Sequence, residues 1–173
     1  MAGLLLCSRS IAAQDGTPES YAITNDYGGR VNYIEMASGV GPIGGQRFIA
    51  TIPGGNTYGG GALADFDGDG DLDYVTASGY QSGNIFLFEK TAPGPSFAAP
   101  VALSNWSGGY YGADIDVGDF NEDGLLDFVM VHYGSYGATV FLGVGNLQFT
   151  RSYYSDVSSL YSFGVAVADF NGD

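Results

Sequence analysis

The amino-acid sequence predicts an all-β protein, and three observations support this fold class. The 173 residues include 29 glycines, 13 tyrosines and 11 phenylalanines. Many glycines and scattered aromatic residues are typical of short strands joined by tight turns. Hydrophobic residues make up 45% of the chain, which is enough to build a core. Finally, aspartate-rich stretches recur along the chain, and each complete one is followed directly by a strand-like apolar run.

An internal repeat organises the chain. The stretch "ADFDGDGDLDYVTAS" at 64–78 returns as "GDFNEDGLLDFVMVH" at 118–132 and as "ADFNGD" at 168–173. The first aspartates of successive copies are 54 and 50 residues apart. The apolar stretches between the acidic loops also match, and we align "GNIFLFEK" at 83–90 with "GATVFLGV" at 137–144. A period of about 50 residues is typical of propeller blades, whereas solenoids repeat at about 20–30 residues.

Each repeat is predicted to form four short strands. In the second repeat, "LDYVTAS" alternates apolar and polar residues, and "NIFLFEK" is a continuous apolar run typical of an inner strand. Pro100 cannot donate a ladder hydrogen bond, which places the last strand at a sheet edge. The four predicted strands are 58–66, 72–78, 84–90 and 96–104. Four antiparallel strands per repeat predict β-propeller blades, and the chain holds an incomplete propeller.

We expect the repeat region to cover residues 21–173. The first blade lacks an acidic loop, and Phe48 is expected to occupy the position that Phe97 and Phe149 hold in the next two. The predicted blades are about 21–57, 58–110 and 111–162, with the start of a further one at 163–173.

Residues 1–20 are predicted to be a separate N-terminal segment. Their beginning, "MAGLLLCSRSIAAQDG", has features of a secretory signal, so the segment is interpreted as a possible signal remnant. The apolar part is shorter than a usual signal core and no basic residue precedes it, so an ordinary N-terminus remains the alternative. Cys7 is the only cysteine, which rules out an internal disulfide.

The net charge of −14 excludes some partners. Only five lysines and arginines are present, so we expect no binding to nucleic acid or to anionic membranes. A membrane span needs about 18 consecutive apolar residues. No stretch of this sequence approaches that length.

The acidic loops are predicted to bind metal ions. Oxygen ligands on alternate residues of a curled loop converge on one point, as a hard cation requires. Gly70 and Gly124 are expected to supply the sharp turn at positive φ. Asp71 and Leu125 are expected to contribute backbone carbonyl oxygens. The full set of predicted ligands is Asp65, Asp67, Asp69, Asp71 and Asp73 in the first loop, Asp119, Asn121, Asp123, Leu125 and Asp127 in the second, and Asp169, Asn171 and Asp173 in the third.

Calcium is the expected ion. A carboxylate-rich cage suits it better than magnesium, which keeps more of its water. Zinc is disfavoured because His132 and Cys7 lie far from the loops in the sequence. An EF-hand opens in a similar way, but it requires a glutamate at the twelfth loop position and flanking helices. Here Thr76 and Met130 occupy that position within strand-like sequence.

The two complete loops, and glycine-rich strands such as "FGVAVADF" at 163–170, resemble FG-GAP or VCBS repeats. These repeats are the blades of the integrin α-subunit type of β-propeller. The resemblance implies structural calcium sites between neighbouring strands of a blade. It also implies an extracellular or periplasmic location and a role in adhesion, carbohydrate binding or scaffolding. The first repeat departs from the pattern, so no metal is expected there.

Other polar and aromatic residues have ordinary explanations. His132 follows a strand without a nucleophile signature nearby, so a core or rim position is favoured over a catalytic base. Asp114 and Asp116 share one face of a strand. They are interpreted as supporting the nearby metal loop, rather than as the paired carboxylates of a glycosidase.

A cluster of aromatic residues lies between the second and third repeats. Trp106, Tyr110 and Tyr111 could form a sugar-stacking platform, but packing between blades is preferred. Asn105 begins a glycosylation sequon, which matters only in a secretory eukaryotic host.

Taken together, the sequence favours a secreted, calcium-stabilised, non-catalytic module for binding or adhesion, with a carbohydrate or protein ligand. Two alternatives remain: a repeat region appended to a carbohydrate-active enzyme, and a self-assembling structural protein. About three blades are fewer than a closed propeller has, which is expected of a fragment, of an incomplete reading frame, or of a subunit that completes itself with other copies. For the isolated chain we expect self-association through open blade edges.

Overall fold

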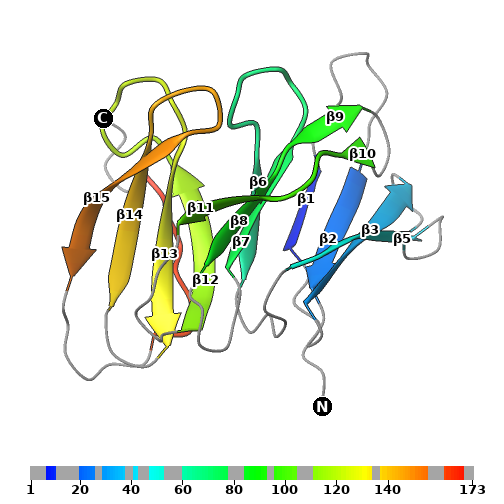
Figure 1. Ribbon diagram of the computed structural model, residues 1–173, viewed down its shortest axis with the longest axis horizontal. Helices are drawn as coiled ribbons and strands as arrows, with labels where there is room; N and C mark the ends of the chain where they lie inside the picture. Colours follow the sequence, from blue (N-terminus) through cyan, green and yellow to red (C-terminus); the bar gives the residue numbers. More distant parts are fainter. Residues whose placement is uncertain are drawn as a thin grey trace.

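The structure is a computed structural model that describes residues 7–10, 20–25, 29–37, 41–42, 47–52, 60–77, 84–92, 96–104, 111–133, 137–155 and 162–169. All the regular secondary structure in these ranges is β-strand, and every strand pairing is antiparallel. Three sheets lie side by side along the long axis of the molecule (Figure 1). The all-β prediction and the incomplete propeller are confirmed.

The second and third sheets are four-stranded blades, as the repeat predicts. Strand order in the second is β11-β8-β7-β6, and in the third it is β12-β13-β14-β15. Strand β11 follows Pro100 and lies at the edge of its sheet, as expected. The strands are β6 (Gly61–Ala64), β7 (Asp73–Ala77), β8 (Ile85–Phe88), β11 (Val101–Ser104), β12 (Tyr111–Gly118), β13 (Asp127–Tyr133), β14 (Ala138–Gly143) and β15 (Phe149–Ser155). A two-stranded ribbon of β9 (Lys90–Ala92) and β10 (Ser96–Phe97) connects β8 to β11.

The first sheet contains strands β1 (Cys7–Ser10), β2 (Ser20–Asn25), β3 (Arg30–Ala37), β4 (Gly41–Pro42) and β5 (Arg47–Thr51). Strand β1 pairs with β2, so this sheet starts before residue 21, where the sequence predicts the repeat region to begin. Both β4 and β5 pair with β3, but at different ends of it.

The predicted equivalence of Phe48 with Phe97 and Phe149 is wrong. Phe97 lies opposite Lys90, and Phe149 lies opposite Gly143 in the corresponding place of the next sheet. Phe48 instead lies opposite Asn32 and is 60% exposed. The cause is β4, which pairs with the last two residues of β3 and leaves β5 to pair with the other end.

The alignment of 83–90 with 137–144 is also corrected by one residue. Tyr74 pairs with Phe88, and its counterpart Phe128 pairs with Phe141. The connection between the paired strands is one residue shorter in the third sheet, which shifts the register of β14 relative to the prediction. Lys90 in the second sheet therefore corresponds to Gly143 in the third.

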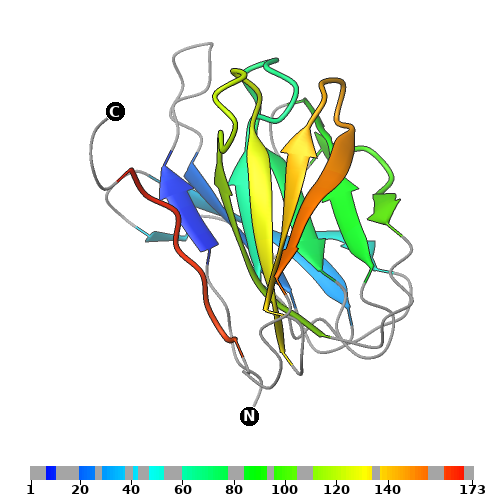
Figure 2. The same ribbon diagram turned by 90° about the vertical axis from the view of Figure 1, so that its left-hand side faces the viewer.

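The middle sheet is covered on both faces, because alternate side chains of a strand point to opposite sides. Tyr74, Phe86 and Phe88 pack with the first sheet, and Val75 and Leu87 pack towards the third. This explains the continuous apolar run of β8, whose four residues are all buried. Figure 2 shows the third sheet in front of the others, which follow behind it in order.

An aromatic cluster joins the second sheet to the third next to the first acidic loop. Phe66 lies 5.4 Å from Phe149 and 6.3 Å from Phe128 between ring centroids, in edge-on geometry. Phe128 in turn stacks on Phe141 at 4.7 Å. Because Phe66 directly follows the first aspartate of the loop, this packing anchors the loop to the neighbouring sheet.

Candidate metal centre

Three carboxylates converge in the loop between β6 and β7. Ligand oxygens of Asp65, Asp67 and Asp69 all lie within 4.8 Å of one another. Asp67 and Asp69 are exposed, and Asp65 is half-buried. Slight desolvation, together with the neighbouring charges of Asp69 and Asp65, raises the pKa of Asp67, against a backbone hydrogen bond from Asp69 that lowers it. The sequence prediction that alternate aspartates meet at one point is reproduced by the fold of the loop.

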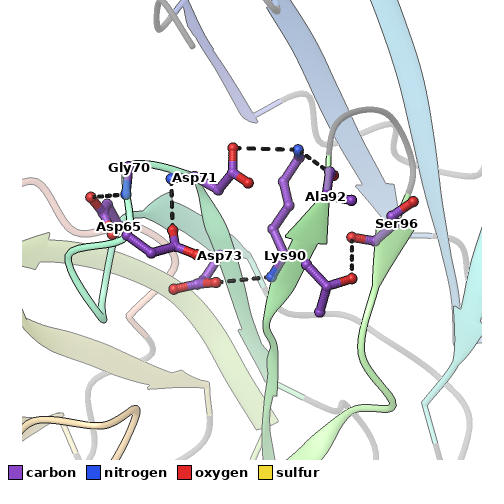
Figure 3. A network of polar contacts seen from close by, with 9 residues as sticks. Asp65, Gly70, Asp71, Asp73, Lys90, Ala92 and Ser96 are labelled. Carbon is purple, nitrogen blue, oxygen red and sulfur yellow. Dashed lines mark hydrogen bonds and ion pairs between the residues drawn. The ribbon is translucent and has the colours of Figure 1, made fainter. Parts of the chain in front are cut away.

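Backbone amides curl the first loop around its own aspartates. Asp65 accepts hydrogen bonds from the amides of Gly68 and Gly70, at 2.8 and 3.0 Å (Figure 3 draws the second). The amide of Asp69 donates to Asp67 at 3.1 Å, and that of Asp71 donates to Asp69 at 2.8 Å. Gly70 has a φ of 94°, as the sequence predicted, in the left-handed region that favours glycine.

Asp73, the last predicted ligand of this loop, has a different setting. It is 1% exposed, and its two oxygens accept hydrogen bonds from the amides of Lys90 at 2.9 Å and Phe66 at 3.1 Å. Burial raises the pKa of Asp73 to about 7, although these two hydrogen bonds oppose the rise. The negative charges of Asp67 and Asp69 raise it further. Asp73 thus lies outside the group of three convergent carboxylates and joins the loop to the start of β9.

The second loop, between β12 and β13, repeats most of this hydrogen-bonding pattern, but its first aspartate accepts from the amide four residues on, where Asp65 accepts from the amide three residues on. Asp119 accepts from the amides of Gly124 at 2.9 Å and Asp123 at 3.2 Å. Asp123 accepts from Leu125 at 2.8 Å, and the oxygen of Asn121 accepts from Asp123 at 3.2 Å. Gly124 has the predicted positive φ, at 85°. The aspartate-to-asparagine change between the loops therefore preserves the curl.

Asp127 reproduces the position of Asp73. It is 0% exposed and accepts hydrogen bonds from the amides of Phe120 at 2.7 Å and Gly143 at 2.8 Å. Two copies of this arrangement in one chain indicate that the ninth loop residue is a structural acceptor in its own right.

The third predicted loop is only partly within the described residues. Asp169 is exposed at the end of the segment 162–169, which runs beside β12 (Figure 1). Asn171 and Asp173 lie outside the described residues, so their role as ligands stays a prediction.

Sequence reasoning missed one residue at this site, Lys90. Its side chain is 1% exposed, and its ammonium donates to the carbonyl of Ala92 at 2.8 Å. The same nitrogen lies 3.7 Å from Oδ1 of Asp71, beside the acidic loop (Figure 3). Lys90 is the only lysine of the chain, and this was the signal that could have drawn attention to it.

The interpretation of Asp114 and Asp116 as supports of a metal loop is wrong. Both lie on one face of β12, but their oxygens accept from the amides of Val165 at 3.2 Å and Val167 at 2.6 Å. The two carboxylates thus bind the backbone of the segment 162–169, because that segment runs beside the face on which they lie. Each also accepts from the amide of the residue that follows it.

His132 is a core residue, as the sequence favoured. It is 2% exposed, and its Nε2 lies 2.9 Å from Oγ1 of Thr139. Burial lowers its pKa to about 4.

Among the residues considered for a sugar-stacking platform, Tyr111 lies within the described residues and begins β12 opposite Tyr133. Asn105, Trp106 and Tyr110 lie outside the described residues.

The donor set fits a hard divalent cation. The convergent side chains found among the described residues, those of Asp65, Asp67 and Asp69, all offer carboxylate oxygens, which suits calcium. In the second loop the amide of Asn121 instead donates to Asp123 at 2.9 Å. Without a cation, the three carboxylates of the first loop repel one another, and the same repulsion contributes to the raised pKa of Asp73.

Antiparallel four-stranded sheets in series, each with a curled aspartate loop between its first two strands, define a blade-repeat protein. The FG-GAP-like repeat model matches residues 65–130 and 119–173, which together are more than half of the chain. The chain therefore belongs to the FG-GAP-like repeat family. A comparison with curated proteins found no match. Within the described residues, no helix has the length and apolar character to cross a membrane.

Proposed function

We propose that the chain is a calcium-stabilised repeat module that serves binding or adhesion outside the cell and has no catalytic activity. The observation that carries the proposal is the convergence of Asp65, Asp67 and Asp69 within 4.8 Å in a loop that joins two strands of a blade. Membership of the FG-GAP-like repeat family supports the same function.

The residues proposed to hold calcium are the side chains of Asp65, Asp67 and Asp69 in the first loop, with Asp73 beside them and the backbone carbonyl of Asp71. In the second loop they are Asp119, Asn121 and Asp123, with Asp127 and the carbonyl of Leu125. Bound calcium supplies positive charge that offsets carboxylate repulsion. The chain itself supplies the curl, through the amides that donate to these aspartates.

The proposed consequence of calcium binding is that the strands of a blade are held together more firmly. Asp73 and Asp127 already connect each loop to the third strand region of its blade through backbone amides. A loop whose charges are neutralised holds these acceptors in place, so calcium stabilises the connection between strands. The burial of His132, the only histidine, supports a non-catalytic role because it removes that base from solvent.

Self-association is proposed as part of this function. Several large apolar residues of the third repeat and the following segment are exposed, namely Phe120 at 38%, Val144 at 52% and Phe163 at 72%. The counterpart of Phe120 in the second repeat, Phe66, is buried against the next sheet. A second copy is the proposed cover for these residues. Light scattering in calcium buffer should detect oligomers, and a monodisperse monomer would contradict this part of the proposal.

Calorimetric melting in calcium and in chelator tests the main proposal. Structural binding at saturating metal should stabilise the fold by on the order of 2–4 kcal/mol and raise the melting temperature by several degrees. The double variant Asp65→Asn, Asp69→Asn should lose part of this increase. Glu122→Gln, which removes an exposed charge of the second loop at a position not expected to bind metal, is the matched control and should keep it. Identical melting of the wild-type chain with and without calcium refutes the proposal.

A further inference from the structure

Lys90 is a buried cation at the edge of the first acidic loop. Its ammonium is held between the carbonyl of Ala92 at 2.8 Å and the carboxylate of Asp71 at 3.7 Å. The backbone amide of the same residue binds Asp73 at 2.9 Å. Figure 3 shows the lysine side chain lying alongside the loop, with its ammonium on the side of Asp71. One residue thus contacts the loop through both its main chain and its charge.

The second loop replaces this charged pair by an uncharged one. Leu125 takes the place of Asp71, and Gly143 takes the place of Lys90, with its amide bound to Asp127 in the same way. The two replacements are also neighbours, because a Cβ on Gly143 would lie 3.4 Å from Cβ of Leu125. The same Cβ would come within 2.6 Å of the carbonyl oxygen of Leu126, so a lysine does not fit there without a backbone shift.

The two loops differ in how their charges are placed: the first has five aspartates with Lys90 beside them, and the second has three aspartates and Glu122 with Gly143 in the place of the lysine. The first loop carries one more aspartate than the alternating pattern needs, and this extra residue, Asp71, faces the ammonium of Lys90. A positive charge fixed beside a cluster of carboxylates offsets part of their repulsion when no metal is bound. It also repels an incoming divalent cation. Because the lysine side chain is 1% exposed, salt screens this effect less than it would at the surface.

We propose that Lys90 sets the calcium response of the first loop: it acts as a built-in cation that makes this loop less dependent on calcium, and weaker in binding it, than the loop would be without the lysine. The second loop has Gly143 in the equivalent position, and the uncharged amide of Asn121 donates to its Asp123 at 2.9 Å. This inference rests on the proposed calcium-binding function. It makes the two loops of one chain unequal sites.

Calcium titration by calorimetry, combined with melting in chelator, tests the inference on the full chain. The step that belongs to the first loop is identified as the one lost in Asp65→Ala. Lys90→Met keeps the apolar stem and the backbone amide but removes the charge. It should raise the affinity of the first-loop step by on the order of tenfold. It should also lower the melting temperature in chelator. The second-loop step serves as an internal reference and should not change.

Further variants separate the charge of Lys90 from general effects. Arg151→Met removes a positive charge from an exposed position on β15 and should leave both steps unchanged. Asp71→Asn leaves the lysine charge without its carboxylate and should weaken the first-loop step. The double variant Asp71→Asn, Lys90→Met should bind more tightly than Asp71→Asn alone. If Lys90→Met alone does not fold, the comparison of the double variant with Asp71→Asn tests the lysine charge in its place.

The outcomes distinguish the two proposals. If the wild-type chain binds calcium in two steps, and removal of the lysine charge changes neither step in either background, the role of Lys90 is refuted and the calcium function stands. If the wild-type chain binds no calcium, both proposals fail. A selective increase in the first-loop affinity supports both.

Discussion

The carboxylate of Asp73 accepts a hydrogen bond of 2.9 Å from the backbone amide of Lys90, at a separation of 17 residues in the chain. Its other oxygen accepts from Phe66, within the loop that follows the first strand. One buried side chain therefore joins the acidic loop to the third strand region of the blade. Asp127 makes the same two connections in the next blade.

Replacing either of these acceptors should destabilise the fold even without metal. Asp73→Asn and Asp127→Asn each leave one buried backbone amide facing an NH₂ group, which cannot accept its hydrogen bond. The free energy of unfolding should fall by about 1–3 kcal/mol. Urea unfolding in chelator measures this loss. Glu122→Gln should show no comparable change, and an unchanged midpoint for Asp73→Asn would contradict the role of this residue.

The phenylalanine that follows the first aspartate of each loop should have unequal importance. Phe66 is 6% exposed and packs on Phe128 and Phe149, whereas Phe120 in the next repeat is 38% exposed. Phe66→Ala should therefore lower the free energy of unfolding by about 3–5 kcal/mol. Phe120→Ala should cost less than about 1 kcal/mol in the dissociated chain. Denaturant unfolding of this pair at low protein concentration checks the difference, and equal losses would contradict the packing.

The buried histidine predicts a dependence of stability on pH. The pKa of His132 is lowered by burial to about 4, from an ordinary value of 6.5 in the unfolded chain. Between these values the imidazole binds more protons in the unfolded state, so the contribution of His132 to the free energy of unfolding falls as the pH is lowered from 6.5 towards 4. Asp73, whose pKa is raised to about 7, contributes in the opposite direction over the same range. The contribution of His132 approaches about 1.4 kcal/mol per pH unit at most.

Urea unfolding across this pH range, compared between the wild-type chain and His132→Gln, measures that contribution. The variant should lose less stability on acidification, because it has no imidazole to protonate, while the carboxylates contribute equally to both proteins. Parallel pH profiles would contradict the assignment of a neutral, buried His132.

Asp114 and Asp116 should hold the segment 162–169 against β12. Their carboxylates accept from the amides of Val165 and Val167. In the double variant Asp114→Ala, Asp116→Ala, hydrogen exchange of these two amides should become faster, because the acceptors are gone. The amide of Gly143, bound to Asp127, is the internal control and should exchange as in the wild-type chain. Unchanged protection at Val165 and Val167 would show that other contacts hold the segment.

The blade architecture could be predicted from the sequence because the acidic loops recur at a nearly constant interval. The loops mark the connection between the first and second strands, and Pro100 marks an edge. The register of β14 could not be predicted, since the apolar residues within 83–90 and 137–144 do not by themselves fix which positions pair. The place of Phe48 was missed because β4, a two-residue strand, leaves no recognisable pattern.

At the site, too, local features could be predicted from the sequence and contacts between strands could not. Alternating aspartates and the glycines after them predicted the curl of both loops, because this geometry depends on neighbouring residues. The dual acceptor role of Asp73 and the charge of Lys90 beside Asp71 depend on strand pairing across the blade. Contacts of that kind become visible only when the register is known. Asp114 and Asp116 were assigned to the wrong partner for the same reason.

Diffraction from crystals grown in saturating calcium tests the central claim most directly, through an anomalous difference map at a wavelength where calcium scatters anomalously. We predict a peak enclosed by the oxygens of Asp65, Asp67 and Asp69, and a second one at Asp119, Asn121 and Asp123. A map in which both loops are well ordered and neither encloses a peak would contradict the account.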